Sequence, residues 1–133
     1  MSATHQEEEL VVQGFHHFGI LVQDVNKAKE FYLNILGLQD ESHLRHVLPY
    51  PGAFIKCGVN QIHLMQLPSP DKDTIRPEYA GHDKHIAIAV SNVEAVARRL
   101  KRHNIAFNMS SSGRKALFTR DFDNNALEFT EVV

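Results

Sequence analysis

The sequence contains an internal repeat, and this repeat restricts the possible folds more than any other feature. Residues 17–32 read HFGILVQDVNKAKEFY, and residues 85–100 read HIAIAVSNVEAVARRL. At an offset of 68 residues the two segments share four identities, which pair His17 with His85, Ile20 with Ile88, Val22 with Val90 and Val25 with Val93. Each copy therefore begins with a histidine and is expected to run through a short strand into an amphipathic helix.

Capping signals place the start of each expected helix. Asp24 precedes the first helix and can accept hydrogen bonds from its free amide groups. Gly37 stands where a glycine commonly ends a helix. In the second copy, Ser91 and Glu94 form the S-x-x-E pattern of a capping box. We expect both helices to pack one apolar face on the strands.

Three further short strands are expected after each helix. They cover 39–48, 52–57 and 61–67 in the first half, and 105–109, 115–120 and 126–131 in the second. The intervening segment 68–81 contains three prolines and no apolar periodicity, which is typical of a linker or a loop over a site. The predicted class is therefore α+β, with two βαβββ modules forming a curved mixed sheet, shaped like a cup, and helices packed outside.

The predicted boundaries follow from these elements. A flexible tail covers 1–13, and a single domain covers 14–133. That domain consists of module 14–67 and module 82–133, joined by linker 68–81.

Four possible metal ligands occupy matching positions in the two modules. His17 and His85 open the first strands, and His63 and Glu128 lie on the last strands. Strand alternation puts bulky aliphatic residues on the opposite face of all four strands, and mostly small or polar residues beside the four side chains. Three imidazoles and one carboxylate suit a divalent Zn, Ni, Fe, Mn or Co ion better than Ca or Mg.

Composition excludes several classes of partner. The net charge of -2 and the sequence pI near 6.5 give no electrostatic reason to expect a nucleic acid or a membrane surface. No apolar run is long enough to span a bilayer, and the first residues do not resemble a signal peptide. The one cysteine, Cys57, fits a reducing compartment, so a cytoplasmic location is expected.

The sequence resembles the vicinal oxygen chelate superfamily, also called the glyoxalase, bleomycin-resistance and dioxygenase family. HHFGILVQDVNKAKEFYLNILGL resembles its first module, DKHIAIAVSNVEAVARRL its second, and RDFDNNALEF its closing strand. This resemblance covers about residues 15–131. It implies a glyoxalase-like fold and a metal held by His17, His63, His85 and Glu128, with Glu128 also in the catalytic role.

The resemblance leaves the reaction open, because the superfamily includes isomerases, lyases, ring-cleaving dioxygenases, thiol transferases and binding proteins. Isomerase or lyase chemistry on a small oxygenated substrate is the leading expectation. A dioxygenase, a thiol transferase of the fosfomycin-resistance type or a non-catalytic binding protein is the alternative. His63 replaces the carboxylate that is usual in glyoxalase I, which argues against that particular enzyme.

The sequence also predicts further site residues and an assembly. Substrate-binding candidates on strands or on the expected rim of the pocket are Lys56, Arg120, Tyr50 and His46. The resemblance also implies a homodimer, formed either by packing two chains side by side or by exchanging modules between them.

Overall fold

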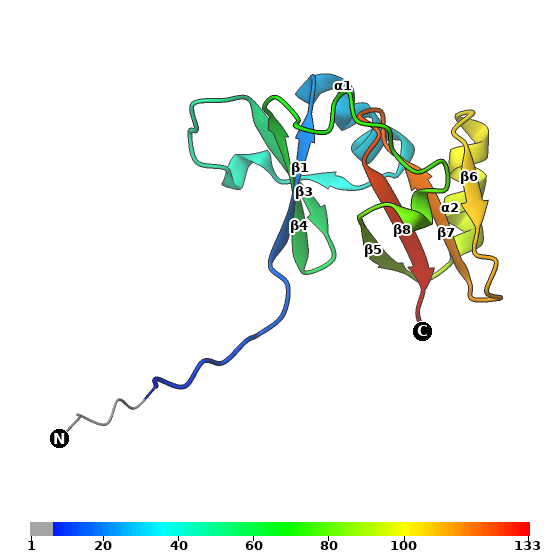
Figure 1. The fold of residues 1–133 in the computed structure, drawn as a ribbon. Coiled ribbons are helices and arrows are strands. Elements are labelled where there is room, and N and C mark those ends of the chain that lie inside the picture. Colours follow the sequence, from blue (N-terminus) through cyan, green and yellow to red (C-terminus); the bar gives the residue numbers. More distant parts are fainter. Residues whose placement is uncertain (1–6) are drawn as a thin grey trace.

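The computed structural model describes residues 7–133, and it contains two four-stranded mixed sheets (Figure 1). Their strand orders, β1-β4-β3-β2 and β5-β8-β7-β6, are equivalent, so the predicted glyoxalase-like α+β class with two βαβββ modules is confirmed. The strands are β1 (His17–Val22), β2 (Gln39–Asp40), β3 (Gly52–Cys57), β4 (Asn60–Gln66), β5 (His85–Val90), β6 (Phe107–Met109), β7 (Ala116–Arg120) and β8 (Ala126–Glu131). The helices are α1 (Val25–Lys29), α2 (Val93–Arg102), the π-helical η1 (Glu30–Ile35) and the 3-10 turns η2 (Ser42–Leu44) and η3 (Ala80–His82).

In each module the first strand pairs in parallel with the last. Gly19 of β1 lies opposite His63 of β4, and Ala87 of β5 lies opposite Glu128 of β8. The repeat therefore extends to the register of the sheets, because Gly19 and Ala87 are themselves 68 residues apart. This register brings each first-strand histidine next to the ligand candidate of its own last strand.

The helices begin as capping chemistry requires, although one cap differs from the prediction. Asp24 accepts hydrogen bonds from two amide groups of α1, as expected. In the second module the cap is Asn92, whose side chain accepts from the Ala95 amide. The predicted capping box of Ser91 and Glu94 is wrong, because α2 starts one residue later and Glu94 is then too near the start to close it.

The strand predicted for 39–48 is also much shorter than expected. It ends at Asp40, whose carboxylate accepts a hydrogen bond from the Ser42 amide and starts the η2 turn. The Ser42 hydroxyl then accepts from the Phe54 amide of β3. After one more backbone bond, from the Glu41 amide to the Phe54 carbonyl, these side-chain bonds turn the chain away from β3, and residues 45–51 form a loop.

One hydrophobic core extends through both modules. The aliphatic faces of β1, β4, β5 and β8 point into it together with the buried sides of the helices. Its largest fully buried members come from both halves of the chain: Phe31, Tyr32, Ile55, Ile62, Leu64, Leu100, Leu117 and Leu127. The opposite faces of the edge strands β1 and β5 are open, and His17, Gly19, Ala87 and Ala89 are exposed there.

A buried polar contact joins the modules. The Tyr32 hydroxyl of η1 donates to the Asp121 carboxylate after β7 at 2.6 Å. That carboxylate also accepts from the backbone and side-chain amides of Asn125. Burial raises the pKa of Asp121, and burial together with the charge of Asp121 raises the pKa of Tyr32. The pair thus fixes η1 against the β7–β8 turn.

The segment before β1 has no regular structure in the part of the chain that is described. Of the predicted flexible tail, residues 1–6 lie outside the described residues, and residues 7–16 have no regular secondary structure and are exposed. Within residues 7–133, no helix has the length and apolar character needed to cross a membrane.

We predict that Tyr32→Phe lowers the free energy of unfolding by about 1–3 kcal/mol, because Asp121 loses a buried donor. Urea titration followed by circular dichroism measures this change. Tyr50→Phe is the control, because the Tyr50 hydroxyl makes no hydrogen bond within residues 7–133. Equal stabilities of the two variants would contradict a structural role for the buried pair.

Candidate metal centre

The first module places two histidines in direct contact. The rings of His17 on β1 and His63 on β4 stack with their centroids 3.9 Å apart. Phe54 of β3 stacks on the other side of His63 at 3.8 Å. The Oε1 atom of Gln61 accepts a hydrogen bond from the Nε2 atom of His63 at 2.9 Å, so both faces and one edge of this ring are fixed. The neighbouring His16 contacts the His17 ring through Nδ1 at 2.8 Å.

The second module places a histidine against a buried carboxylate. The Nε2 atom of His85 lies 3.1 Å from Oε1 of Glu128, and the His85 Nδ1 atom lies 2.7 Å from the Asp83 carbonyl oxygen. Glu128 is 7% exposed, and its Oε2 atom accepts from Arg114 at 3.2 Å. Phe118 of β7 stands edge-on to the His85 ring at 5.5 Å. An oriented imidazole beside a carboxylate is half of a typical metal site.

The four ligand candidates form two pairs, not one cluster. Among residues 7–133 of a single chain, no three His, Cys, Asp or Glu side chains are arranged to hold a metal ion. Each pair lies on its own sheet and on the same equivalent face. The first pair offers two imidazole nitrogens, and the second offers one imidazole nitrogen and one carboxylate. Such donors suit a transition metal.

The pKa of His63 is strongly lowered in the folded chain. Burial, together with the smaller effects of the charges of His17, His16 and Arg45, lowers its pKa to about 4. The imidazole is therefore neutral at physiological pH, which is the form that binds metals.

The substrate-binding candidates from the sequence lie in different surroundings. Lys56 is exposed on β3, on the same side as Phe54 and His63 by strand alternation. Tyr50 is half-buried in the loop before β3, and His46 of that loop is exposed. Arg120 donates to Asp83, to the Asn124 carbonyl and to the Pro77 carbonyl, so it joins β7 to the linker.

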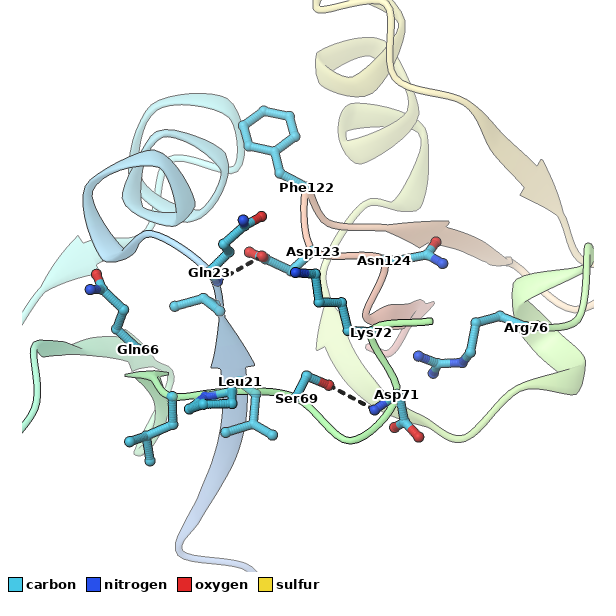
Figure 2. Close-up of a pocket in the computed structure, with 13 residues that line it drawn as sticks. Leu21, Gln23, Gln66, Ser69, Asp71, Lys72, Arg76, Phe122, Asp123 and Asn124 are labelled. Carbon is cyan, nitrogen blue, oxygen red and sulfur yellow. Dashed lines mark hydrogen bonds between the residues drawn. The ribbon is translucent and has the colours of Figure 1, made fainter. Parts of the chain in front are cut away.

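Two clefts follow the seam between the modules. One of about 560 Å³ lies among the ends of β1 and β4, the linker and the β7–β8 turn, and it contains none of the four ligand candidates (Figure 2). Lys72 and Arg76 share its lining with Asp71 and Asp123, so its charges are mixed. The other, of about 310 Å³, is lined by β1, the linker and His85. The larger cleft is therefore separate from the candidate metal centre.

Sequence reasoning did not single out the two phenylalanines that pack on the candidate ligands. Phe54 lies opposite His63 and Phe118 lies opposite Glu128 in the sheets. They are 64 residues apart, close to the offset of 65 that relates His63 to Glu128. Extending the repeat to the third strands relates these two positions to each other, but it does not show that they pack on the candidate ligands.

The model of the Glyoxalase/Bleomycin resistance protein/Dioxygenase superfamily matches residues 14–129. The chain belongs to this superfamily. The protein YaeR of Escherichia coli is 33% identical over 92 residues, which cover 68% of this chain and 70% of YaeR. Human mitochondrial methylmalonyl-CoA epimerase is 32% identical over 98 residues, which cover 68% of this chain and 53% of the epimerase.

Solved structures agree on the fold. A glyoxalase family protein from Bacillus anthracis has a TM-score of 0.74 at 20% identity, covering 95% of this chain and 100% of that one. A mutant of the fosfomycin resistance protein FosX from Listeria monocytogenes, complexed with Mn(II) and dihydroxypropylphosphonic acid, has a TM-score of 0.70 at 20% identity, covering 92% and 95%. These likenesses establish the glyoxalase-like arrangement of the two modules.

The low pKa of His63 predicts a pH dependence of the metal-free protein. In the unfolded chain the imidazole gains its proton near pH 6.5, whereas in the folded chain it does so only near pH 4. The contribution of His63 to stability is therefore complete above pH 6.5 and is lost as the pH falls toward 4. Chemical denaturation of the wild type and of His63→Gln at pH 7.5, 6 and 4.5 tests this. The wild type should lose more stability than the variant, and parallel curves would contradict the assignment.

Proposed function

We propose that this protein is a metal-dependent enzyme that binds one divalent ion through His17, His63, His85 and Glu128. The observation that carries the proposal is the presence of two donor pairs at repeat-equivalent positions on equivalent sheet faces. A divalent Zn, Ni, Fe, Mn or Co ion fits three imidazoles and a carboxylate. Such an ion supplies a Lewis acid that stabilises an enolate or oxyanion of a substrate chelated through two oxygens.

We further propose that each site forms between two copies of the chain. The pairs do not meet within one chain, and the strand faces that carry His17 and His85 are open to solvent. Burying those faces against a second copy would join the His17–His63 pair of one chain with the His85–Glu128 pair of the other. A two-fold symmetric dimer of this kind has two equivalent sites.

The residues around the donors have definite roles in this proposal. Phe54 and Phe118 keep water from one side of the imidazoles and hold the rings in place. The Gln61 side-chain oxygen accepts from Nε2 of His63, and the Asp83 carbonyl accepts from Nδ1 of His85. Each bond sets the tautomer of its histidine, which leaves the other nitrogen for the metal. Glu128, which is buried and accepts a hydrogen bond from Arg114, is the candidate for the catalytic carboxylate.

Isomerase or lyase chemistry on a small oxygenated substrate is the reaction class that we propose. The sequence similarity to methylmalonyl-CoA epimerase favours this class over the dioxygenase and thiol-transferase alternatives. A location in the cytoplasm, with no nucleic-acid or membrane partner, remains part of the proposal.

Metal analysis of purified variants tests the ligand set. His85→Ala and Glu128→Gln should each lower the metal content several-fold relative to wild type, because each removes a donor. Mass spectrometry of the metals in dialysed protein measures it. His103→Ala, at the exposed end of α2, is the matched control and should retain full content. Wild-type metal content in His85→Ala would refute the assignment.

Mixing two defective chains tests whether sites form between copies. One chain carries His17→Ala and His63→Ala, and the other carries His85→Ala and Glu128→Ala. If each site takes one pair from each chain, a mixed dimer regains one intact site, so random reassortment should recover about one metal per four chains. Sites built within single chains would recover none, and that result would contradict the shared site.

A further inference from the structure

Each module carries an arginine on the loop that leads into its third strand. Arg45 lies in the loop before β3, and Arg114 lies in the turn before β7. Because the two modules are equivalent, the two arginines approach equivalent faces of their sheets. Arg114 bonds directly to the candidate ligand Glu128, and Arg45 lies against Gly52 on the sheet face that carries His63.

The position of Arg45 follows from the glycine opposite it. Gly52 shares a strand face with Phe54 and Lys56, and Phe54 stacks on His63. A Cβ atom on Gly52 would lie 2.6 Å from the Leu64 carbonyl oxygen, and also 2.8 Å from Nη2 and 3.0 Å from Cζ of Arg45. The guanidinium therefore occupies the space that a side chain at Gly52 would take, on the face that carries His63.

The Arg45 guanidinium is held there without a carboxylate. Its Nη2 donates to the Tyr50 carbonyl at 2.7 Å, and its Cζ lies 5.3 Å from the centre of the Tyr50 ring. Within residues 7–133 it forms no ion pair. The remaining N–H groups are thus positioned but not used by the protein.

Arg114 is bound in a way that leaves most of its donors free. One N–H group donates to Glu128 at 3.2 Å, and the side chain is 53% exposed. The other basic side chains near the linker are occupied, because Arg76 and Arg120 both pair with Asp83. Arg45 and Arg114 are therefore guanidinium groups with free donors, one beside each donor pair, and Lys56 adds a further exposed cation on the face of His63.

We propose that Arg45 and Arg114 bind an oxyanion group of the substrate, a carboxylate, phosphate or phosphonate. This inference rests on the proposed two-copy site, in which Arg45 accompanies His17 and His63, and Arg114 accompanies His85 and Glu128. The proposed site combines a divalent ion and two guanidinium groups with a single carboxylate, so its net charge is strongly positive. This charge favours the binding of an anionic substrate group. Guanidinium groups match the geometry of such oxyanions through paired N–H bonds.

Two chelators that differ only in an anionic tail test the proposal. Acetohydroxamate and the monohydroxamate of succinate chelate a metal through the same two oxygens, but only the second carries a carboxylate. Isothermal titration into Mn²⁺-loaded wild type should favour the succinate derivative by about tenfold, the value of one good charged hydrogen bond. In Arg45→Gln and Arg114→Gln this preference should shrink, whereas the affinity for acetohydroxamate should stay within about twofold.

Matched variants separate charge from folding. Arg45→Lys and Arg114→Lys keep the positive charge and should retain part of the preference. Arg98→Gln, on the exposed side of α2, should retain all of it. An equal preference in the wild type and in both glutamine variants would overturn the inference, as would a wild type that binds both chelators equally.

A second titration separates this inference from the proposed function. If Mn²⁺ does not bind, the metal proposal fails, and inorganic phosphate titrated into metal-free protein decides the anion site alone. Binding to wild type that is lost in the Arg45→Gln, Arg114→Gln double variant supports the inference. Absent binding, or equal binding in both proteins, overturns it.

Discussion

The parallel pairing of the first strand with the last strand in each module is the constraint on which the rest of the structure depends. β1 pairs with β4, and β5 pairs with β8, in the same register. A parallel pair needs a long crossover, which the helix and the intervening strands supply. The pairing brings His17 beside His63 and His85 beside Glu128, although 46 and 43 residues separate them in the chain.

Burial on one face of these strands fixes that register energetically. A slip by one residue would expose Ile20, Val22 and Ile88, which are now buried, and would turn the histidines into the core. The same alternation leaves small residues beside His17 and His85 on the open face. The placement of the four ligand candidates is thus a consequence of how the core is packed.

The two modules have equivalent strands but surround their ligand candidates with different side chains. In the first, stacking and burial keep His63 neutral between two aromatic rings. In the second module, the Glu128 carboxylate contacts the His85 imidazole through one oxygen and the Arg114 guanidinium through the other. The contact of Tyr32 with Asp121 fixes the modules of one chain side by side, with their cores continuous. The donor pairs lie on the opposite faces of the strands and are not part of this shared core.

The sequence by itself determined the repeat, the fold class, the strands that carry the donors and the cap at Asp24, because periodicity and capping are local properties of the chain. It could not determine the start of α2 or the early end of β2, since single side-chain bonds of Asn92, Asp40 and Ser42 decide these. Only the tertiary structure decided that the four donors form two separate pairs, that Phe54 and Phe118 pack beside them, and that Gly52 makes room for Arg45. These features arise from contacts between strands and loops that are distant in sequence, and no local pattern encodes such contacts.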